Sequence, residues 1–161
     1  MRFAPSFSQT LRKKLRIIGG GKNKISMTHV DNYCHGLILG EEALYPGSPA
    51  LGNFYIVTDK EPQYLWKVLD NAFVSLGYNS LYSKLAVPGF IIMPVSYLVQ
   101  FAGYLLGRKF KLNPFAVRML MIHRWFDITA AERDLKYQPI ISFEDGWRDT
   151  IAWFKSNMDY D

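Results

Sequence analysis

Residues 85–107 contain no charged side chain and are bounded by Lys84 and Arg108. About 20 apolar residues suffice for a helix to span a bilayer, but Pro88 and Pro94 would kink such a helix. We consider three structures for this segment: a shallow or hairpin membrane attachment, a true span, or a helix in a globular core. Basic residues at both ends suit anionic lipid headgroups. The candidate membrane-contact residues are Phe90, Ile91, Ile92, Leu98, Phe101 and Leu105.

The composition predicts a folded chain with a packed core. The protein has 161 residues, of which 49% are hydrophobic and 16% aromatic, which excludes a disordered chain. Its single cysteine, Cys34, excludes an intrachain disulfide and a paired-cysteine zinc site. The net charge of +5 comes with one short basic run, so we expect no nucleic-acid partner.

The first 21 residues are rich in arginine and contain no acidic residue. Two interpretations stay open. The composition is typical of an organelle transit peptide, which would make a mitochondrial location an alternative. The other interpretation is an amphipathic helix, whose apolar face would be Phe3, Phe7, Leu11 and Leu15.

The glycines Gly19–Gly21 predict a tight turn between apolar Ile17–Ile18 and a strand at residues 25–27. They do not form a dinucleotide-binding fingerprint, because the position that would complete G-x-G-x-x-G is Lys24. The phosphate-loop pattern is also absent from the sequence. We therefore expect the glycines to be structural.

The next segment predicts a helix, capped by Thr28 or Asp31 and stopped by residues 46–49. Its apolar stripe is Val30, Tyr33, Cys34, Leu37, Ile38 and Leu44. We expect this stripe to be buried, with Cys34 a core residue rather than a nucleophile. His29 and His35 are expected to bond to neighbouring backbone.

Residues 53–58 predict a buried strand, and residues 58–61 fit a capping box for a helix that ends at Gly77. A second capping box at residues 129–132 predicts a short helix reaching Leu135. Ser142 and Asp145 would cap a final helix. The apolar repeat of that helix is Phe143, Trp147, Ile151 and Phe154.

No catalytic template is complete in the sequence. A short-chain dehydrogenase needs a tyrosine with a lysine one helical turn later, and none of the ten tyrosines has one. The nearest approach is Tyr104 with Arg108, a poor substitute because arginine stays charged. The three histidines have no metal-ligand spacing. We therefore assign no catalytic residue and no metal ligand.

One stretch carries a family resemblance. Residues 20–36 read GGKNKISMTHVDNYCHG and resemble a block of the 3β-hydroxysteroid dehydrogenase family, typically G-x-N-x-x-D-F-T-Y-V-D-N-V-V-H-A. This family belongs to the extended short-chain dehydrogenases, and the sterol 4α-carboxylate 3-dehydrogenases are its most similar branch. The resemblance continues through residues 43–49, 52–58, 76–78, 126–131, 135–139 and 143–147.

The resemblance implies an α/β fold and places residues 1–161 in the C-terminal part of an extended short-chain dehydrogenase of Rossmann type. That part supplies late strands and a helical substrate-binding subdomain, with the apolar segment 85–107 inside it. The family's glycine fingerprint and its catalytic serine or threonine, tyrosine and lysine lie upstream of this block. The N-terminal dinucleotide-binding βαβ units are therefore expected to be absent, and an N-terminal half is an expected partner.

The resemblance also points to site residues. The family's Asp-Phe is here Ser26-Met27, and its tyrosine before Val-Asp is His29. In related enzymes this strand-to-helix junction lies near the substrate and the nicotinamide. The candidates near substrate or cofactor are therefore Met27, His29, Asp31 and Asn32, of which the last two could instead organise the start of the helix.

For an intact enzyme, the resemblance implies oxidation of a 3β-hydroxyl of a steroid or sterol to a ketone, with NAD or NADP as acceptor. It also implies attachment to the cytoplasmic face of the endoplasmic reticulum membrane. We expect this chain to be inactive alone. Two alternatives are a non-enzymatic, membrane-associated lipid-binding module and an extended short-chain dehydrogenase acting on another substrate class, such as nucleotide sugars.

Overall fold

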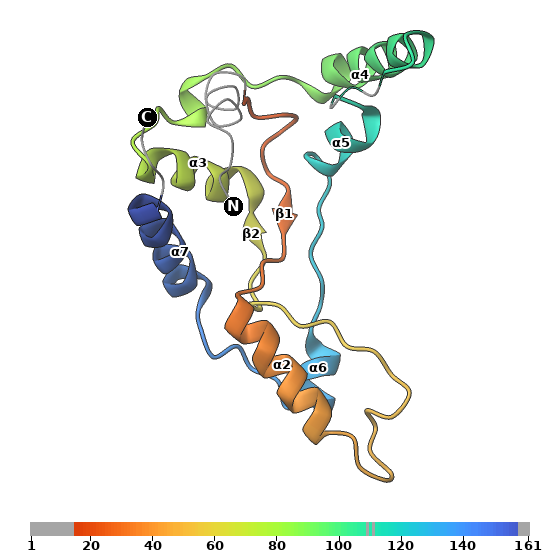
Figure 1. Cartoon of the computed structure of the whole chain (residues 1–161), viewed down its shortest axis with the longest axis vertical. Helices are drawn as coiled ribbons and strands as arrows, with labels where there is room; N and C mark the ends of the chain where they lie inside the picture. Colours follow the sequence, from red (N-terminus) through yellow and green to blue (C-terminus); the bar gives the residue numbers. More distant parts are fainter. Residues whose placement is uncertain (1–14, 109, 111, 158–161) are drawn as a thin grey trace. The chain divides into compact units, whose positions relative to one another are not determined.

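The computed structural model describes residues 15–108, 110 and 112–157 (Figure 1). The basic segment at the N-terminus lies almost entirely outside these residues. The described chain forms two compact units. The first contains residues 15–23 and 64–123, and the second contains residues 24–63 and 124–157.

The first unit is helical. It contains α3 (Leu65–Ser75), the 3-10 helix η1 (Leu81–Ser83), α4 (Gly89–Leu105) and α5 (Pro114–Met119). Its buried core joins Ile17, Trp66 and Leu81. The predicted glycine turn is present, with Gly19 and Gly21 at positive φ. Ile18, however, forms a parallel bridge with Val87 rather than pairing with residues 25–27.

The helix predicted after residue 58 begins later than the capping box suggested. Thr58 Oγ1 accepts a hydrogen bond from the Lys60 N–H at 3.3 Å, which forms a local turn. Lys60 has a φ of 72°, so the chain cannot continue as a right-handed helix there. The helix α3 starts at Leu65 without a side-chain cap. Its predicted end is confirmed, because Gly77 follows with a φ of 81°.

The uncharged segment forms α4, which contains Pro94. This helix buries its small residues, Ser96 and Gly103. Its large apolar side chains are exposed, including Phe90, Leu98, Phe101, Tyr104 and Leu105. Within the described residues, no helix has the length and hydropathy that a membrane crossing requires. The helix α4 therefore presents an apolar face without being a candidate span.

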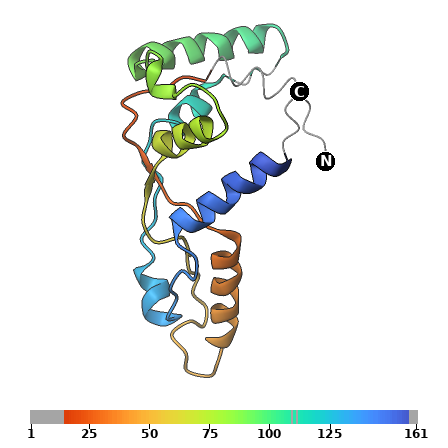
Figure 2. The same ribbon diagram turned by 90° about the vertical axis from the view of Figure 1, so that its left-hand side faces the viewer.

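The second unit contains the strands of the fold. The strand β1 (Lys24–Ile25) is hydrogen-bonded to β2 (Gln63–Tyr64). Tyr64, the last residue of β2, already belongs to the first unit. Ile25 also forms a parallel bridge with Arg124. Three helices follow: α2 (Val30–Glu42), α6 (Thr129–Asp134) and α7 (Phe143–Asn157). Figures 1 and 2 show α2 and α6 side by side, around a core of Ala43, Ala50, Ile128, Ala131, Leu135 and Tyr137.

The expected burial of α2 is wrong. Its buried residues are Asn32 and Gly36, whereas Val30, Tyr33, Leu37, Ile38 and Leu44 are exposed. Cys34 is exposed as well, which contradicts its assignment to the core. The reason is that α2 packs against residues 53–58 through its small residues. A Cβ at Gly36 would lie 3.0 Å from Val57 Cγ1, so glycine permits this close approach.

Residues 53–58 are extended but belong to no named strand. Tyr55 and Val57 pack on the core, while Phe54 is 89% exposed. The expectation of a buried strand is therefore wrong, because the segment forms no named strand and Phe54 is exposed. A strand needs a hydrogen-bonded neighbour along its length, and no such neighbour lies among the described residues.

The two C-terminal helices agree with their predicted bounds. The helix α6 ends with Leu135 as its C-cap, but Asp127 rather than Thr129 bonds its first turn. Ser142 caps α7 as predicted, because its Oγ accepts a hydrogen bond from the Asp145 N–H at 3.1 Å. Of the predicted apolar repeat of α7, Ile151 is buried.

Asn32 joins three parts of the second unit. Its side chain is fully buried, and its Nδ2 donates to Asp59 Oδ1 at 2.7 Å and to the Ile141 carbonyl at 2.8 Å. Its Oδ1 accepts from the N–H groups of Ile140 and Ile141 at 2.8 and 2.9 Å. Both donors and both acceptor positions of the amide are therefore used.

Replacing Asn32 tests this role. In Asn32→Leu, the N–H groups of Ile140 and Ile141 and the Ile141 carbonyl lose their side-chain partner, and each buried orphan costs about 1–3 kcal/mol. We expect the free energy of unfolding to fall by about 3 kcal/mol or more, measured by urea denaturation with tryptophan fluorescence. The exposed neighbour Asp31→Asn is the control, and equal losses for the two variants would contradict the assignment.

Candidate functional site

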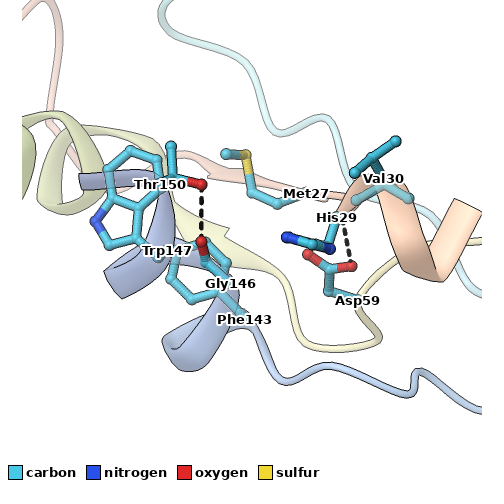
Figure 3. Close-up of a pocket in the computed structure, with 9 residues that line it drawn as sticks. Met27, His29, Val30, Asp59, Phe143, Gly146, Trp147 and Thr150 are labelled. Atoms are coloured by element: carbon cyan, nitrogen blue, oxygen red, sulfur yellow. Dashed lines mark hydrogen bonds between the residues drawn. The ribbon is translucent and has the colours of Figure 1, made fainter. Parts of the chain in front are cut away.

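The second unit contains a pocket of 310 Å³ (Figure 3). It is lined by Met27, Thr28, His29, Val30, Asp59, Phe143, Gly146, Trp147 and Thr150. Four of these residues have apolar side chains and four have polar ones, and apolar atoms make up most of the exposed lining. Ligand pockets generally share this composition and occupy about 300–1,000 Å³. This pocket is at the small end of that range, so it suits one end of a ligand.

The chain direction explains where the pocket lies. Residues 24–27 end where α2 begins, and the extended segment 53–59 ends beside them. The Asp59 N–H donates to the Met27 carbonyl at 2.9 Å, so the two segments end next to each other. In α/β folds, ligands bind beyond the carboxyl ends of the strands. The pocket therefore occupies the place where such a fold places its ligand.

His29 is the N-cap of α2 and lines the pocket. Its Nδ1 accepts a hydrogen bond from the Asp31 N–H at 3.2 Å, which confirms the predicted bond to neighbouring backbone. A nitrogen that accepts a hydrogen bond carries no proton, so the neutral ring has its proton on Nε2. His29 consequently offers a hydrogen-bond donor at the opposite edge of its ring.

The opposite wall of the pocket comes from α7. Phe143 and Trp147 stack with ring centroids 5.9 Å apart. Gly146 lies between them in the helix, and a Cβ there would be 2.6 Å from His29 Cδ2. Figure 3 shows the His29 ring facing this part of α7. Glycine at position 146 therefore lets the imidazole lie close to the helix.

Asp59 is the acidic residue of the pocket. Its Oδ1 accepts from the His29 N–H at 2.8 Å and from Asn32 Nδ2. Behind it, Tyr137 is fully buried and donates to the Thr58 carbonyl at 3.0 Å. Burial and the Asp59 charge raise the pKa of Tyr137 to about 12. This tyrosine therefore stays protonated and is structural.

The structure separates the four residues expected near substrate or cofactor. Met27 and His29 line the pocket. Asp31 is exposed in the first turn of α2, and Asn32 is buried in the hydrogen-bond network described above. Neither side chain lines the pocket.

Sequence reasoning missed the residues that reach the pocket from far along the chain. Asp59 was recognised only as part of a capping box and Gly146 only as part of a block of family resemblance, whereas Thr150 gave no signal. Phe143 and Trp147 were recognised as an apolar repeat, but the repeat alone did not show that they line a pocket. Within the described residues, no group of three or more His, Cys, Asp or Glu side chains could hold a metal ion.

Comparisons with known proteins give similar relatives, although no family model matches the chain. A 3β-hydroxysteroid-dehydrogenase/decarboxylase, isoform 2, from Arabidopsis thaliana is 34% identical over 146 residues, which cover 86% of this chain and 26% of that protein. A 3β-hydroxysteroid dehydrogenase from Mycolicibacterium neoaurum is 28% identical over 98% of this chain and 43% of that protein. The human sterol-4α-carboxylate 3-dehydrogenase, decarboxylating, is 26% identical over 86% of this chain and 38% of that protein.

The fold is also found in a solved structure. The crystal structure of gox2253 matches 95% of this chain and 44% of its own chain, with a TM-score of 0.63 and 18% identity. Each of these matches leaves more than half of the relative uncovered. This chain therefore spans less than half the length of these relatives.

Two glycine substitutions test the packing of the pocket wall. Gly146→Ala should push His29 aside and lower the free energy of unfolding, whereas Gly40→Ala meets no atom within 4 Å and should raise it by about 1 kcal/mol. Thermal or urea denaturation measures both. In a His29→Ala background, Gly146→Ala should cost less than it does in the wild-type chain, because the clash is gone. An equal cost in both backgrounds would show that His29 does not contact Gly146.

Proposed function

We propose that this chain, which belongs to the 3β-hydroxysteroid dehydrogenase family and matches its C-terminal half, forms the substrate-binding part of a steroid or sterol dehydrogenase. The intact enzyme would oxidise a 3β-hydroxyl to a ketone with NAD or NADP. The chain by itself would bind the substrate without turning it over. Family membership supports the reaction class, and the pocket supports the binding role.

The observation that carries this proposal is the apolar pocket at the carboxyl ends of residues 24–27 and 53–59. Its stacked Phe143–Trp147 pair offers a flat apolar wall, which suits a rigid ring system. The His29 Nε2–H is placed to donate a hydrogen bond to an oxygen at the end of such a ligand.

In an intact enzyme, the described residues would have different roles. Met27, Phe143 and Trp147 would bind the apolar body of the substrate and exclude water. His29 would orient its oxygen, and Asn32 would hold Asp59 and the His29 backbone in place. NAD or NADP would supply the hydride acceptor when bound. The glycine fingerprint and the Tyr-x-x-x-Lys pair needed for cofactor binding and proton removal are not in this sequence.

Steroid binding can be measured directly. Pregnenolone, a 3β-hydroxysteroid, should change the fluorescence of Trp147 in the wild-type chain. We expect His29→Ala to weaken binding about tenfold, because one hydrogen bond is lost. Trp147→Phe would identify the fluorescence signal. The control His123→Ala changes a histidine outside the pocket and should bind normally. An absence of saturable binding would contradict the proposal.

We also propose that the exposed face of α4 attaches this chain to a membrane surface, in keeping with an endoplasmic reticulum location on the cytoplasmic side. The helix has 17 residues, which at about 1.5 Å each is shorter than the hydrocarbon core of a bilayer. Lying in the interface would bury Phe90, Leu98 and Phe101, while Lys84 and Arg108 meet anionic headgroups. Ile91 and Leu105 share this exposed face, whereas Ile92 is half-buried. A lipid-binding module without enzymatic activity would use the same face.

Vesicle flotation tests the attachment. Ile91→Asp/Leu98→Asp should release the chain from vesicles of phosphatidylcholine and phosphatidylserine, because it places two charges in the apolar face. Val74→Asp, which alters an exposed apolar residue of α3, is the matched control and should still float. Binding should weaken without phosphatidylserine. Flotation of the double variant at the wild-type level would refute attachment through α4.

A further inference from the structure

Two threonines that line the pocket have already used their protons within the protein. Thr28 Oγ1 donates to the Val57 carbonyl at 3.3 Å. Thr150 Oγ1 donates to the Gly146 carbonyl at 2.7 Å, a bond drawn in Figure 3. A hydroxyl has one proton to donate and two lone pairs. The oxygens of Thr28 and Thr150 therefore offer a ligand acceptor positions only.

Asp59 adds a third acceptor to the pocket, and this one is charged. Its Oδ1 accepts from the His29 N–H at 2.8 Å and from Asn32 Nδ2 at 2.7 Å. Within the part of the chain that the structure describes, no hydrogen bond reaches Asp59 Oδ2. Since Asp59 lines the pocket, its second oxygen remains available to a ligand.

His29 is the donor of the pocket. Its Nδ1 accepts from the Asp31 N–H, so the proton of the neutral ring is on Nε2. Trp147 also has an N–H, but Figure 3 shows its indole nitrogen on the side of the ring away from His29. Around the imidazole, the lining side chains thus offer a ligand one donor and three acceptors.

A hydroxyl group matches this set, because it both donates and accepts. It can accept from His29 Nε2–H and donate to Asp59 Oδ2, and the bond between the His29 N–H and Asp59 keeps these two side chains adjacent. A ketone oxygen has no proton for Asp59 and would face its negative charge. An ammonium group has no lone pair for the His29 donor. The pocket therefore suits an alcohol better than a ketone or an amine.

We propose that the pocket binds a steroid hydroxyl other than the one that is oxidised, and that Asp59 determines the preference for a hydroxyl over a ketone at this position. This inference rests on the proposed function and deepens it, since it adds a second hydroxyl, away from the 3β-carbon, to the substrate. The pocket of 310 Å³ suits one end of a ligand. The 3β-hydroxyl would then be at the end that remains outside.

The chemistry of the reaction places the reacting oxygen elsewhere. Oxidation of an alcohol removes the hydroxyl proton and a hydride from carbon, and it leaves a ketone. In this pocket the ketone would lose its bond to Asp59, so the lining residues stabilise the alcohol and not the product. No tyrosine lines the pocket to take the hydroxyl proton. The hydroxyl held by His29 and Asp59 is therefore a recognition group.

Two steroids that differ at one position test the preference. Both 17β-hydroxy-5α-androstan-3-one and 5α-androstane-3,17-dione have a ketone at carbon 3, and they differ only at carbon 17. Calorimetry with the full chain measures their affinities. We expect the alcohol to bind about tenfold more tightly, because the ketone loses a hydrogen bond to a charged group. Neither steroid has a 3β-hydroxyl, so the gain would come from the second hydroxyl.

Asp59→Asn tests the carboxylate. The Oδ1 of an asparagine can keep the bonds to the His29 N–H and to Asn32, while its Nδ2 puts a donor in place of Asp59 Oδ2. We expect the preference to reverse, so that the dione binds at least as tightly as the alcohol. Asp149→Asn makes the same change on α7 at an exposed residue that does not line the pocket, and it should keep the tenfold preference. Circular dichroism melting verifies that each variant is folded.

The comparison of the two steroids on the wild-type chain needs no variant. Equal affinities there would overturn the proposal, and so would an unchanged preference in folded Asp59→Asn. Tighter binding of 17β-amino-5α-androstan-3-one than of the alcohol would assign Asp59 to an ammonium ligand and overturn it as well. Pregnenolone binding without a preference at carbon 17 would overturn this inference alone, whereas absence of saturable binding for every steroid would contradict the proposed function itself.

Discussion

The amide of Asn32 holds the second unit together and sets both walls of its pocket. Its Nδ2 donates to Asp59, and Asp59 also accepts a hydrogen bond from the N–H of His29 at the N-terminus of α2. It also binds Ile140 and Ile141, two residues before α7 supplies Phe143 to the opposite wall. Because all four of its hydrogen-bonding positions are used, small displacements at either wall would break a buried bond. Asn32 is therefore a positioning residue for the pocket, although it does not line it.

Among the described residues, apolar side chains are exposed on α4, on α2 and on residues 53–58, and these surfaces differ in their surrounding charge. The face of α4 combines large side chains with basic residues at its ends, which suits a lipid surface. The stripe of α2 is accompanied by carboxylates, and residues 53–58 expose backbone groups as well as side chains. Hydrogen-bonding edges are satisfied by another strand and not by lipid tails.

The candidate site was predictable only in part. Met27 and His29 were identified because both lie in the strand-to-helix junction that resembles a family block. Trp147, Gly146 and Asp59 reach the same pocket from distant positions. No periodicity or spacing connects them, since their proximity arises from the way α7 packs beside the start of α2. Gly146 is important because it has no side chain, and a Cβ at this position would clash with the His29 ring. This role depends on which residue lies opposite, so no sequence motif reveals it.

The sequence alone determined the helical character of α2, α6 and α7, the end of α3 before Gly77, the Ser142 cap and the family resemblance, because these depend on neighbouring residues. It did not determine which face of α2 is buried. An apolar stripe predicts burial, but α2 also carries small residues, and Gly36 and Asn32 allow closer packing than Leu37 or Ile38 would. Likewise, residues 53–58 have strand propensity, yet a strand exists only with a neighbour. Tertiary packing decided both points, because each depends on which partner surface is present.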